Sequence, residues 1–303
     1  MTAEPRQVSP QIAKANNINI AFDTFGDPKH QAVLLIMGLG AQMIDWREEF
    51  CLEMAGHGFW VIRFDNRDCG LSEKFEHAGK ANLSEILAKV REGKHVDVAF
   101  GLEDMADDAI GLLDFLNIDK AHIVGVSMGG MIAQTMALSS PERMRSLTSI
   151  MSTTNERGLP RPTAEAAALL YRPAPLDRAE YVEYALQNSI ILGGSAYLHD
   201  EALYRQHAGR RHDRGIYSEG FGRQFAAILT AKGRREALKS LDLPTLVIHG
   251  TIDPLIPVEC GLDTAQAIPN STLKLIEGWG HSLPPALWTT LIETMVDHFS
   301  KAG

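Results

Sequence analysis

Ser127 lies between two glycines, in the run Gly-Val-Ser-Met-Gly of residues 125–129, which has the spacing G-x-S-x-G. The apolar stretch 121–126 precedes the serine, and a helical pattern over residues 131–138 follows it. In a tight strand-to-helix turn the residues at the two glycine positions lie so close to the neighbouring backbone that any side chain larger than hydrogen would collide with it. The pattern predicts a nucleophile presented at the start of a helix; the alternative is a plain glycine-rich turn.

A serine hydroxyl becomes a strong nucleophile only when a base removes its proton and an acid orients that base. Of the 11 histidines, His281 lies between the last strand pattern, 272–276, and the last helical pattern, 287–299. Asp253 follows the strand pattern 245–249, where a loop can reach the histidine. The order Ser, acid, His is typical of G-x-S-x-G hydrolases. We therefore predict a triad of Ser127, Asp253 and His281.

Three alternatives stay open at this point. His249 ends a strand pattern, but it precedes the candidate acid, so we expect it to support the site or belong to the core. Glu156, a few residues after the strand pattern 147–151, is a rival acid. Asp253 precedes a proline and could serve only to form an Asx-turn.

Acyl transfer also builds up an oxyanion, which two backbone N–H groups aimed at one point can stabilise. The residue after the nucleophile, Met128, offers one N–H. The second is expected in the loop after the early apolar stretch 32–37, where Gly-Leu-Gly occupies residues 38–40. We predict that Leu39 supplies it, against the alternative of a plain glycine turn.

Short apolar runs alternate with helical patterns along the chain, and they predict the strands that position these residues. Continuous rather than alternating apolar character is typical of parallel strands that are covered on both faces. The segment 11–25 suggests an antiparallel hairpin at the sheet edge, and 103–116 predicts a helix packed on the sheet. The strand predictions are 18–22, 32–37, 60–64, 121–126, 147–151, 245–249 and 272–276.

A change in composition marks an insertion at residues 155–235. All six tyrosines and none of the four tryptophans lie there, and its charge is +3 while the rest of the chain carries −12. With helical patterns and no strand run, it predicts a helical cap, or lid, over a core of residues 1–154 and 236–303. Its basic run could steer an anionic substrate or form a solvated surface: Arg205, His207, Arg210, Arg211, His212 and Arg214.

Composition excludes several classes of protein. A net charge of −9 over 303 residues disfavours nucleic acid as a partner. The longest apolar or glycine run, 32–41, is far shorter than the roughly 20 residues of a membrane span, and no secretory signal pattern opens the chain, so we expect a cytoplasmic protein. Cys51, Cys69 and Cys260 lack CxxC spacing, which indicates reduced, buried thiols rather than a disulfide frame or a zinc site. We expect neither a metal nor a cofactor.

Together, Gly-Leu-Gly at 38–40, Asp-Asn-Arg-Asp-Cys-Gly-Leu-Ser at 65–72, the Ser127 turn, Asp253 and His281 resemble the α/β-hydrolase superfamily over nearly the whole chain. Residues 102–134 are similar to the serine carboxylesterase group that includes aclacinomycin methylesterase. The resemblance implies a mostly parallel sheet of about eight strands flanked by helices, with a cap of helices over the site. It also implies a structural loop at 65–72, with Arg67 and Asp68 joining strand ends. Met37 departs from the family pattern, since many relatives carry histidine there.

These observations favour a serine hydrolase that cleaves small to medium acyl esters or methyl esters through an acyl-enzyme. A carbon–carbon bond hydrolase or a cofactor-free perhydrolase with the same triad is the alternative, because the fold does not fix the substrate. Serine at position 127 argues against haloalkane dehalogenases and epoxide hydrolases, which need a carboxylate there. A complete triad also disfavours an inactive fold kept for binding.

Overall fold

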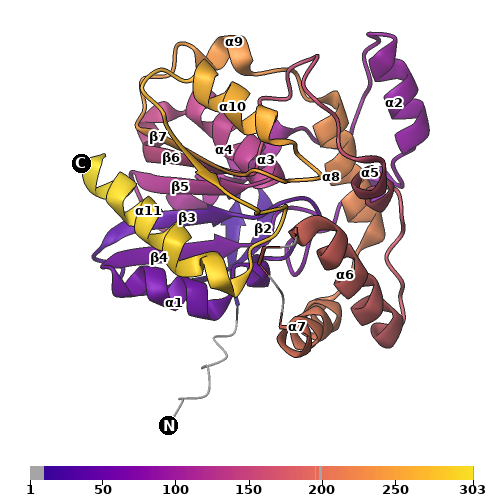
Figure 1. The fold of residues 1–303 in the computed structure, drawn as a ribbon, viewed down its shortest axis with the longest axis horizontal. Helices are drawn as coiled ribbons and strands as arrows, with labels where there is room; N and C mark the ends of the chain where they lie inside the picture. Colours follow the sequence, from indigo (N-terminus) through magenta and orange to yellow (C-terminus); the bar gives the residue numbers. More distant parts are fainter. Residues whose placement is uncertain (1–9, 195, 198–199, 303) are drawn as a thin grey trace.

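The computed structural model describes residues 10–194, 196–197 and 200–302. Its centre is an eight-stranded sheet with the strand order β1-β2-β4-β3-β5-β6-β7-β8 (Figure 1). The strands are β1 (Gln11–Ala15), β2 (Ile18–Phe25), β3 (Gln31–Ile36), β4 (Phe59–Phe64), β5 (Ala121–Val126), β6 (Met144–Ile150), β7 (Thr245–Gly250) and β8 (Thr272–Ile276).

The sheet is mostly parallel, as predicted. β1 and β2 form an antiparallel hairpin at one edge, β2 pairs antiparallel with β4, and all pairs from β4 to β8 are parallel. β6 starts three residues before the apolar pattern that predicted it. Before Leu147 it carries Arg145, which is only partly buried, and Ser146, which is fully buried and lies 2.8 Å from His122 on β5, between Oγ and Nδ1.

Helices cover both faces of the sheet, which explains the continuous apolar runs. Along β3, Leu34 and Ile36 join one core cluster, whereas Val33 and Leu35 join the other. The first face is covered by α3 (Leu102–Phe115), α4 (Met128–Ser139), α9 (Arg235–Leu238) and α10 (Val258–Ala267), and the second by α1 (Glu48–Gly56) and α11 (Trp288–Lys301) (Figure 1).

The described residues of the range 155–235 form four helices, which gather on the right of the sheet in Figure 1. We call them the cap helices: α5 (Ala164–Leu169), α6 (Arg178–Gly193), α7 (Glu201–Arg214) and α8 (Ser218–Thr230). The described residues of this range include no strand. The division into core and cap subdomains at 154/155 and 235/236 stays a prediction. The segment between the strand patterns at 75–101 contains α2 (Leu83–Arg91), which packs against α8.

The three cysteines are free and buried, as predicted. Burial raises the pKa of the Cys51 and Cys69 thiols to about 12 and that of Cys260 to about 11, so all three stay protonated at neutral pH. In the part of the chain that is described, no helix is both long enough and apolar enough to cross a bilayer.

Candidate active site

Ser127 occupies the sharp turn between β5 and α4. Its backbone has φ +56° and ψ −120°, a sparsely populated conformation for a residue with a side chain. Hydrogen bonds on both sides hold it: Ser127 N–H donates to Ile150 O on β6 at 2.9 Å, and Ser127 O accepts from Ser152 Oγ at 2.8 Å and from Gly130 N–H at 2.9 Å. The strained turn is therefore fixed by its surroundings.

The two glycines beside Ser127 are required by close backbone approaches. A Cβ on Gly125 would overlap the carbonyl oxygen of Gly129, and a Cβ on Gly129 would overlap the carbonyl oxygen of Ile36 at the end of β3. No side chain fits at either position without moving the backbone. This is the crowding that the G-x-S-x-G spacing predicts.

His281 and Asp253 meet Ser127 in space. His281 Nδ1 lies 2.7 Å from Asp253 Oδ2, and His281 Nε2 lies 3.0 Å from Ser127 Oγ. A carboxylate can only accept, so in neutral His281 the proton is on Nδ1, which leaves Nε2 free to accept from the serine hydroxyl. The side chain of Asp253 is fully buried and that of His281 is 9% exposed.

Asp253 also forms the Asx-turn that was the alternative interpretation. Its Oδ1 accepts from Leu255 N–H at 2.9 Å and from Ile256 N–H at 2.8 Å, while Oδ2 faces His281. The two interpretations are thus compatible, because the Asx-turn fixes Oδ1 and thereby directs Oδ2 toward His281.

His249 lies beside Asp253 and belongs to the supporting structure. Its Nε2 is 2.8 Å from Ile256 O, so Nε2 is the donor, and it is 3.7 Å from Asp253 Oδ2. Burial lowers the pKa of His249, which favours the neutral ring at pH 7. Because a neutral His249 does not form an ion pair with Asp253, the carboxylate is available to interact with His281.

Glu156, the rival acid, faces elsewhere. A Cβ built on Gly233 would lie 2.7 Å from its Oε2, and its Oε1 accepts from Arg157 N–H. The Nδ1 position of His281 is occupied by Asp253 instead.

The loop that carries Leu39 lies against the serine. A Cβ on Gly38 would be 3.2 Å from Ser127 Cβ and 3.6 Å from its Oγ. Met37, at the position where many relatives carry histidine, has a buried side chain, and its carbonyl oxygen accepts from Asn66 Nδ2 at 2.9 Å. Met128 begins α4, so its N–H is among those without an intrahelical acceptor.

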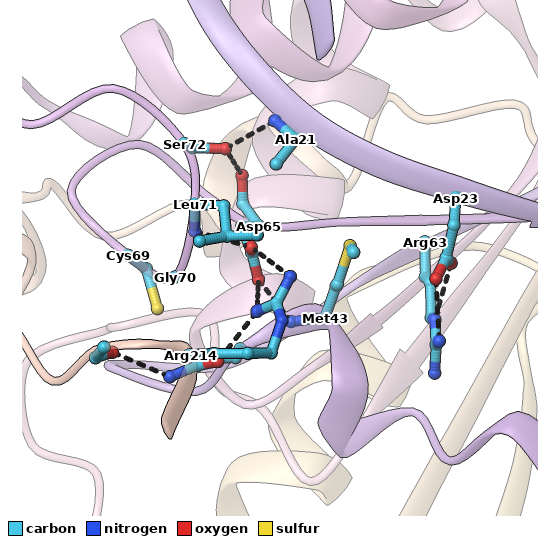
Figure 2. Close-up of polar contacts among 12 residues, drawn as sticks. Ala21, Asp23, Met43, Arg63, Asp65, Cys69, Gly70, Leu71, Ser72 and Arg214 are labelled. Atoms are coloured by element: carbon cyan, nitrogen blue, oxygen red, sulfur yellow. Dashed lines mark hydrogen bonds and ion pairs between the residues drawn. The ribbon is translucent and has the colours of Figure 1, made fainter. Parts of the chain in front are cut away.

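The 65–72 loop links the end of β4 to β2 and to helices of both the core and the cap. Ser72 Oγ accepts from Ala21 N–H on β2 at 2.9 Å and donates to Asp65 O at 2.6 Å. Asp65, fully buried, accepts from Met43 N–H and Leu71 N–H and forms an ion pair with Arg214 at the end of α7, 2.9 Å away (Figure 2). Two further charged residues of the loop also pair with helices: Arg67 with Asp108 on the core helix α3, and Asp68 with Arg223 on the cap helix α8. The expectation that Arg67 and Asp68 join strand ends was wrong, because the ion-pair partners of both side chains lie on helices.

The basic run on α7 is matched by acidic residues, so it forms neither a free steering surface nor a simply solvated one. Its pairs are Arg205 with Glu183 and Glu201, His207 and Arg211 with Asp45, Arg210 with Glu48, His212 with Asp213, and Arg214 with Asp65. Asp45, Glu48 and Asp65 belong to the core, so much of this run ties α7 to it. Among the described residues, no cluster of His, Cys, Asp and Glu is placed to hold a metal ion.

Two contacts between cap helices and the loops that carry Leu39 and His281 have no signal in the sequence. Gln224 on α8 accepts a hydrogen bond from Gly40 N–H, and at the end of α6 Leu192 O accepts one from His281 N–H. A single glutamine and a backbone carbonyl in helical segments carry no motif, so only tertiary structure reveals them.

The chain belongs to the α/β hydrolase fold family, whose model matches residues 31–284. The rhodomycin D methylesterases of Streptomyces sp. (strain C5) and Streptomyces peucetius are each 26% identical to it, over 95% of this chain and 97% of their own. A 2-hydroxymuconate semialdehyde hydrolase of Pseudomonas sp. (strain CF600) is 29% identical over 61% of this chain and 64% of its own.

Two solved structures share the fold. A meta-cleavage product hydrolase from Pseudomonas fluorescens IP01 superposes with a TM-score of 0.74, at 21% identity over 97% of this chain and 98% of that one. An esterase from Rhodococcus sp. ECU1013 superposes with a TM-score of 0.75, at 18% identity over 98% of this chain and 100% of that one.

Proposed function

We propose that this protein is a serine hydrolase of carboxylic esters, with Ser127 as nucleophile, His281 as base and Asp253 as the acid that orients it. The observation that carries the proposal is the continuous hydrogen-bonded chain from Asp253 Oδ2 through both nitrogens of His281 to Ser127 Oγ. The methylesterase relatives, matched over nearly their whole length, support an ester as the substrate.

In the proposed reaction Ser127 Oγ attacks the ester carbonyl while His281 Nε2 takes its proton. The N–H groups of Leu39 and Met128 stabilise the oxyanion. The alcohol leaves with the proton returned by His281, and the acyl group stays on Ser127 as an ester. A water molecule, deprotonated by His281, then attacks that ester and releases the acid. Asp253 remains ionised throughout and stabilises the charged imidazole.

The proposal is tested by hydrolysis of p-nitrophenyl esters from acetate to long acyl chains. We expect short or medium chains to be preferred, and Ser127→Ala to lower kcat by at least about 10⁴-fold. A fluorophosphonate should label the wild type and not Ser127→Ala. The exposed-serine variant Ser240→Ala is the matched control and should keep both activity and labelling.

Other outcomes have defined consequences. Labelling at Ser127 without turnover of any ester would reject the ester substrate and retain the nucleophile. Neither labelling nor turnover would reject the catalytic proposal and favour a binding role for the fold.

A second candidate is hydrolysis of a carbon–carbon bond by the same three residues. The similarity to 2-hydroxymuconate semialdehyde hydrolase favours it, although that match covers only 61% of this chain. The test is the loss of the visible absorbance of 2-hydroxymuconate semialdehyde in the presence of the enzyme. A kcat/KM above that for every p-nitrophenyl ester would make this the primary activity, and no loss would exclude this substrate.

A further inference from the structure

The cap helix α8 places one fully buried polar side chain against the loop that carries Leu39. Gln224 Oε1 accepts from Gly40 N–H at 2.9 Å, and Gln224 Nε2 donates to Arg67 O at 2.7 Å. The side chain therefore bridges two core loops, the one after β3 and the one after β4, by binding a backbone group in each.

The Gly40 N–H belongs to the central peptide of a tight turn. Ala41 N–H donates to Gly38 O at 3.2 Å, which makes residues 38–41 a β-turn with Leu39 and Gly40 at its centre. Gly40 has φ +64°, as the third residue of a type II turn requires. The peptide between Leu39 and Gly40 is the one whose orientation differs between type I and type II turns. Gln224 accordingly holds it in one orientation.

The same turn directs the Leu39 N–H. In a trans peptide the N–H and C=O point in opposite directions, and Gly38 C=O points into the turn toward Ala41. The Leu39 N–H consequently points out of the turn. Type I and type II turns share the bond from Ala41 N–H to Gly38 O, so a flip of the central peptide alone would leave the Leu39 N–H in place. Loss of the Gln224 bond instead weakens the turn itself, and a turn that opens would move the Leu39 N–H away from Ser127, against which Gly38 lies.

Two neighbours of Gln224 on α8 fix its place. The ring of Phe221 lies so close to Gly40 that a Cβ there would be 2.5 Å from Phe221 Cδ2. Arg223 forms a buried ion pair with Asp68, 2.6 Å between Nε and Oδ2. The position of the Gln224 amide is thus set by how α8 docks on the core.

We propose that Gln224 is a positioning residue for the oxyanion hole, and that α8 fixes the position of the Leu39 N–H through the hydrogen bond of Gln224 to the turn. The inference rests on the proposed function. Gln224 acts through the backbone of the turn and does not touch the reacting atoms. If it served only to satisfy two buried backbone groups, its loss would reduce stability alone; as a positioning residue, its loss also weakens binding of the transition state.

Gln224→Met tests this, because methionine has similar length and lacks both strong hydrogen-bonding groups. With p-nitrophenyl acetate, at a temperature where circular dichroism shows a folded protein, we expect kcat to fall about 10- to 100-fold and KM to change less than about threefold. Inhibition by a trifluoromethyl ketone, which binds serine as an oxyanion, should weaken by a similar factor.

Gln134→Met is the matched control. Gln134 is also fully buried and makes two side-chain hydrogen bonds, to Ser149 Oγ and from Arg234 Nε. Its variant should lose stability and keep kcat and the affinity for the inhibitor. Should Gln224→Met not fold, Gln224→Asn, whose shorter side chain cannot bridge both loops, is expected to give the same fall in kcat.

Two results separate this inference from the proposed function. If Ser127→Ala is inactive while a folded Gln224 variant keeps wild-type kcat and inhibitor affinity, the inference is overturned and the proposed function stands. If Ser127→Ala hydrolyses the ester as fast as the wild type, the proposed function fails and this inference fails with it.

Discussion

His281 Nε2 lies 3.0 Å from Ser127 Oγ although 154 residues separate the two in the sequence. The serine follows β5 and the histidine follows β8, two parallel strands whose carboxyl ends lie at the same edge of the sheet. Asp253 follows β7, which is next to β8, so the loop after it reaches the histidine. The order of strands in the sheet therefore brings these residues together.

Replacing Asp253 with asparagine should abolish the base function of His281. The Asn oxygen is expected to keep the bonds from Leu255 and Ile256 N–H, so its NH₂ would face His281 Nδ1. Nδ1 must then accept, which puts the proton on Nε2, the nitrogen that faces Ser127. We expect kcat for p-nitrophenyl acetate to fall about 10³- to 10⁴-fold.

Glu156→Gln is the control for this substitution, because it neutralises the rival acid in the same way. Its kcat should equal that of the wild type. A larger fall in Glu156→Gln than in Asp253→Asn would assign the acid to Glu156.

Gly129→Ala should destabilise the protein strongly. The new Cβ would overlap the carbonyl oxygen of Ile36, which is backbone and cannot move without displacing β3. We expect the free energy of unfolding, measured in urea, to fall by about 3 kcal/mol or more. Gly56→Ala, where no atom lies within 4 Å of the added Cβ, is the control and should be neutral or stabilising by up to about 1 kcal/mol. Equal effects at the two positions would contradict the crowding at the nucleophile turn.

Arg214→Met should loosen α7 from the core. It leaves the fully buried Asp65 carboxylate without its ion pair, although two backbone N–H donors remain. We expect a loss of about 2 to 3 kcal/mol in the free energy of unfolding. Arg178→Met breaks an exposed pair with Asp213 and should cost less than about 0.5 kcal/mol. A loss for Arg214→Met as small as that of the control would show that the buried pair contributes nothing.

Stability should decrease as the pH is lowered from about 6.5 toward 4, in part because of His122. Burial, aided by the Arg145 charge, lowers the pKa of His122 from 6.5 to about 4. Over this range the unfolded chain binds a proton that the folded protein does not, which favours unfolding by up to about 3 kcal/mol at the acid end.

Comparing urea unfolding at pH 7 and pH 4.5 for the wild type and His122→Gln measures this contribution. The variant should lose less stability over the interval, and a control at the exposed His57, His57→Gln, should lose as much as the wild type. His207, His249 and His298, whose pKa values burial also lowers, contribute to the remaining dependence. An unchanged loss in His122→Gln would contradict the assignment.

Local sequence was sufficient to predict the strands and the turn around Ser127. Apolar runs identified the central strands because both faces of the sheet are covered there, and β5, buried throughout, agrees with its pattern at both ends. The pattern of β8 also agrees at both ends, although β8 is an edge strand and mostly not buried. The glycines at 125 and 129 predicted a crowded strand-to-helix turn, and the crowding at Gly125 is local because its neighbour is Gly129 in the same turn. The crowding at Gly129 comes from Ile36 at the end of β3, a contact that only the tertiary structure reveals. The apolar pattern missed the first residues of β6, because polar residues lie there and the burial of a polar side chain depends on a partner distant in the sequence.

Only the tertiary structure decided which groups meet. It brought Asp253 rather than Glu156 to His281, and it paired Asp65 and Asp68 with arginines of α7 and α8. It also set Gln224 against the turn that carries Leu39. The contacts made by the cap helices join segments far apart in the sequence: 149 residues separate Asp65 from Arg214, 155 separate Asp68 from Arg223, and 184 separate Gly40 from Gln224. Their partners depend on how the cap helices dock on the sheet, whereas residue type and spacing report only the local chain.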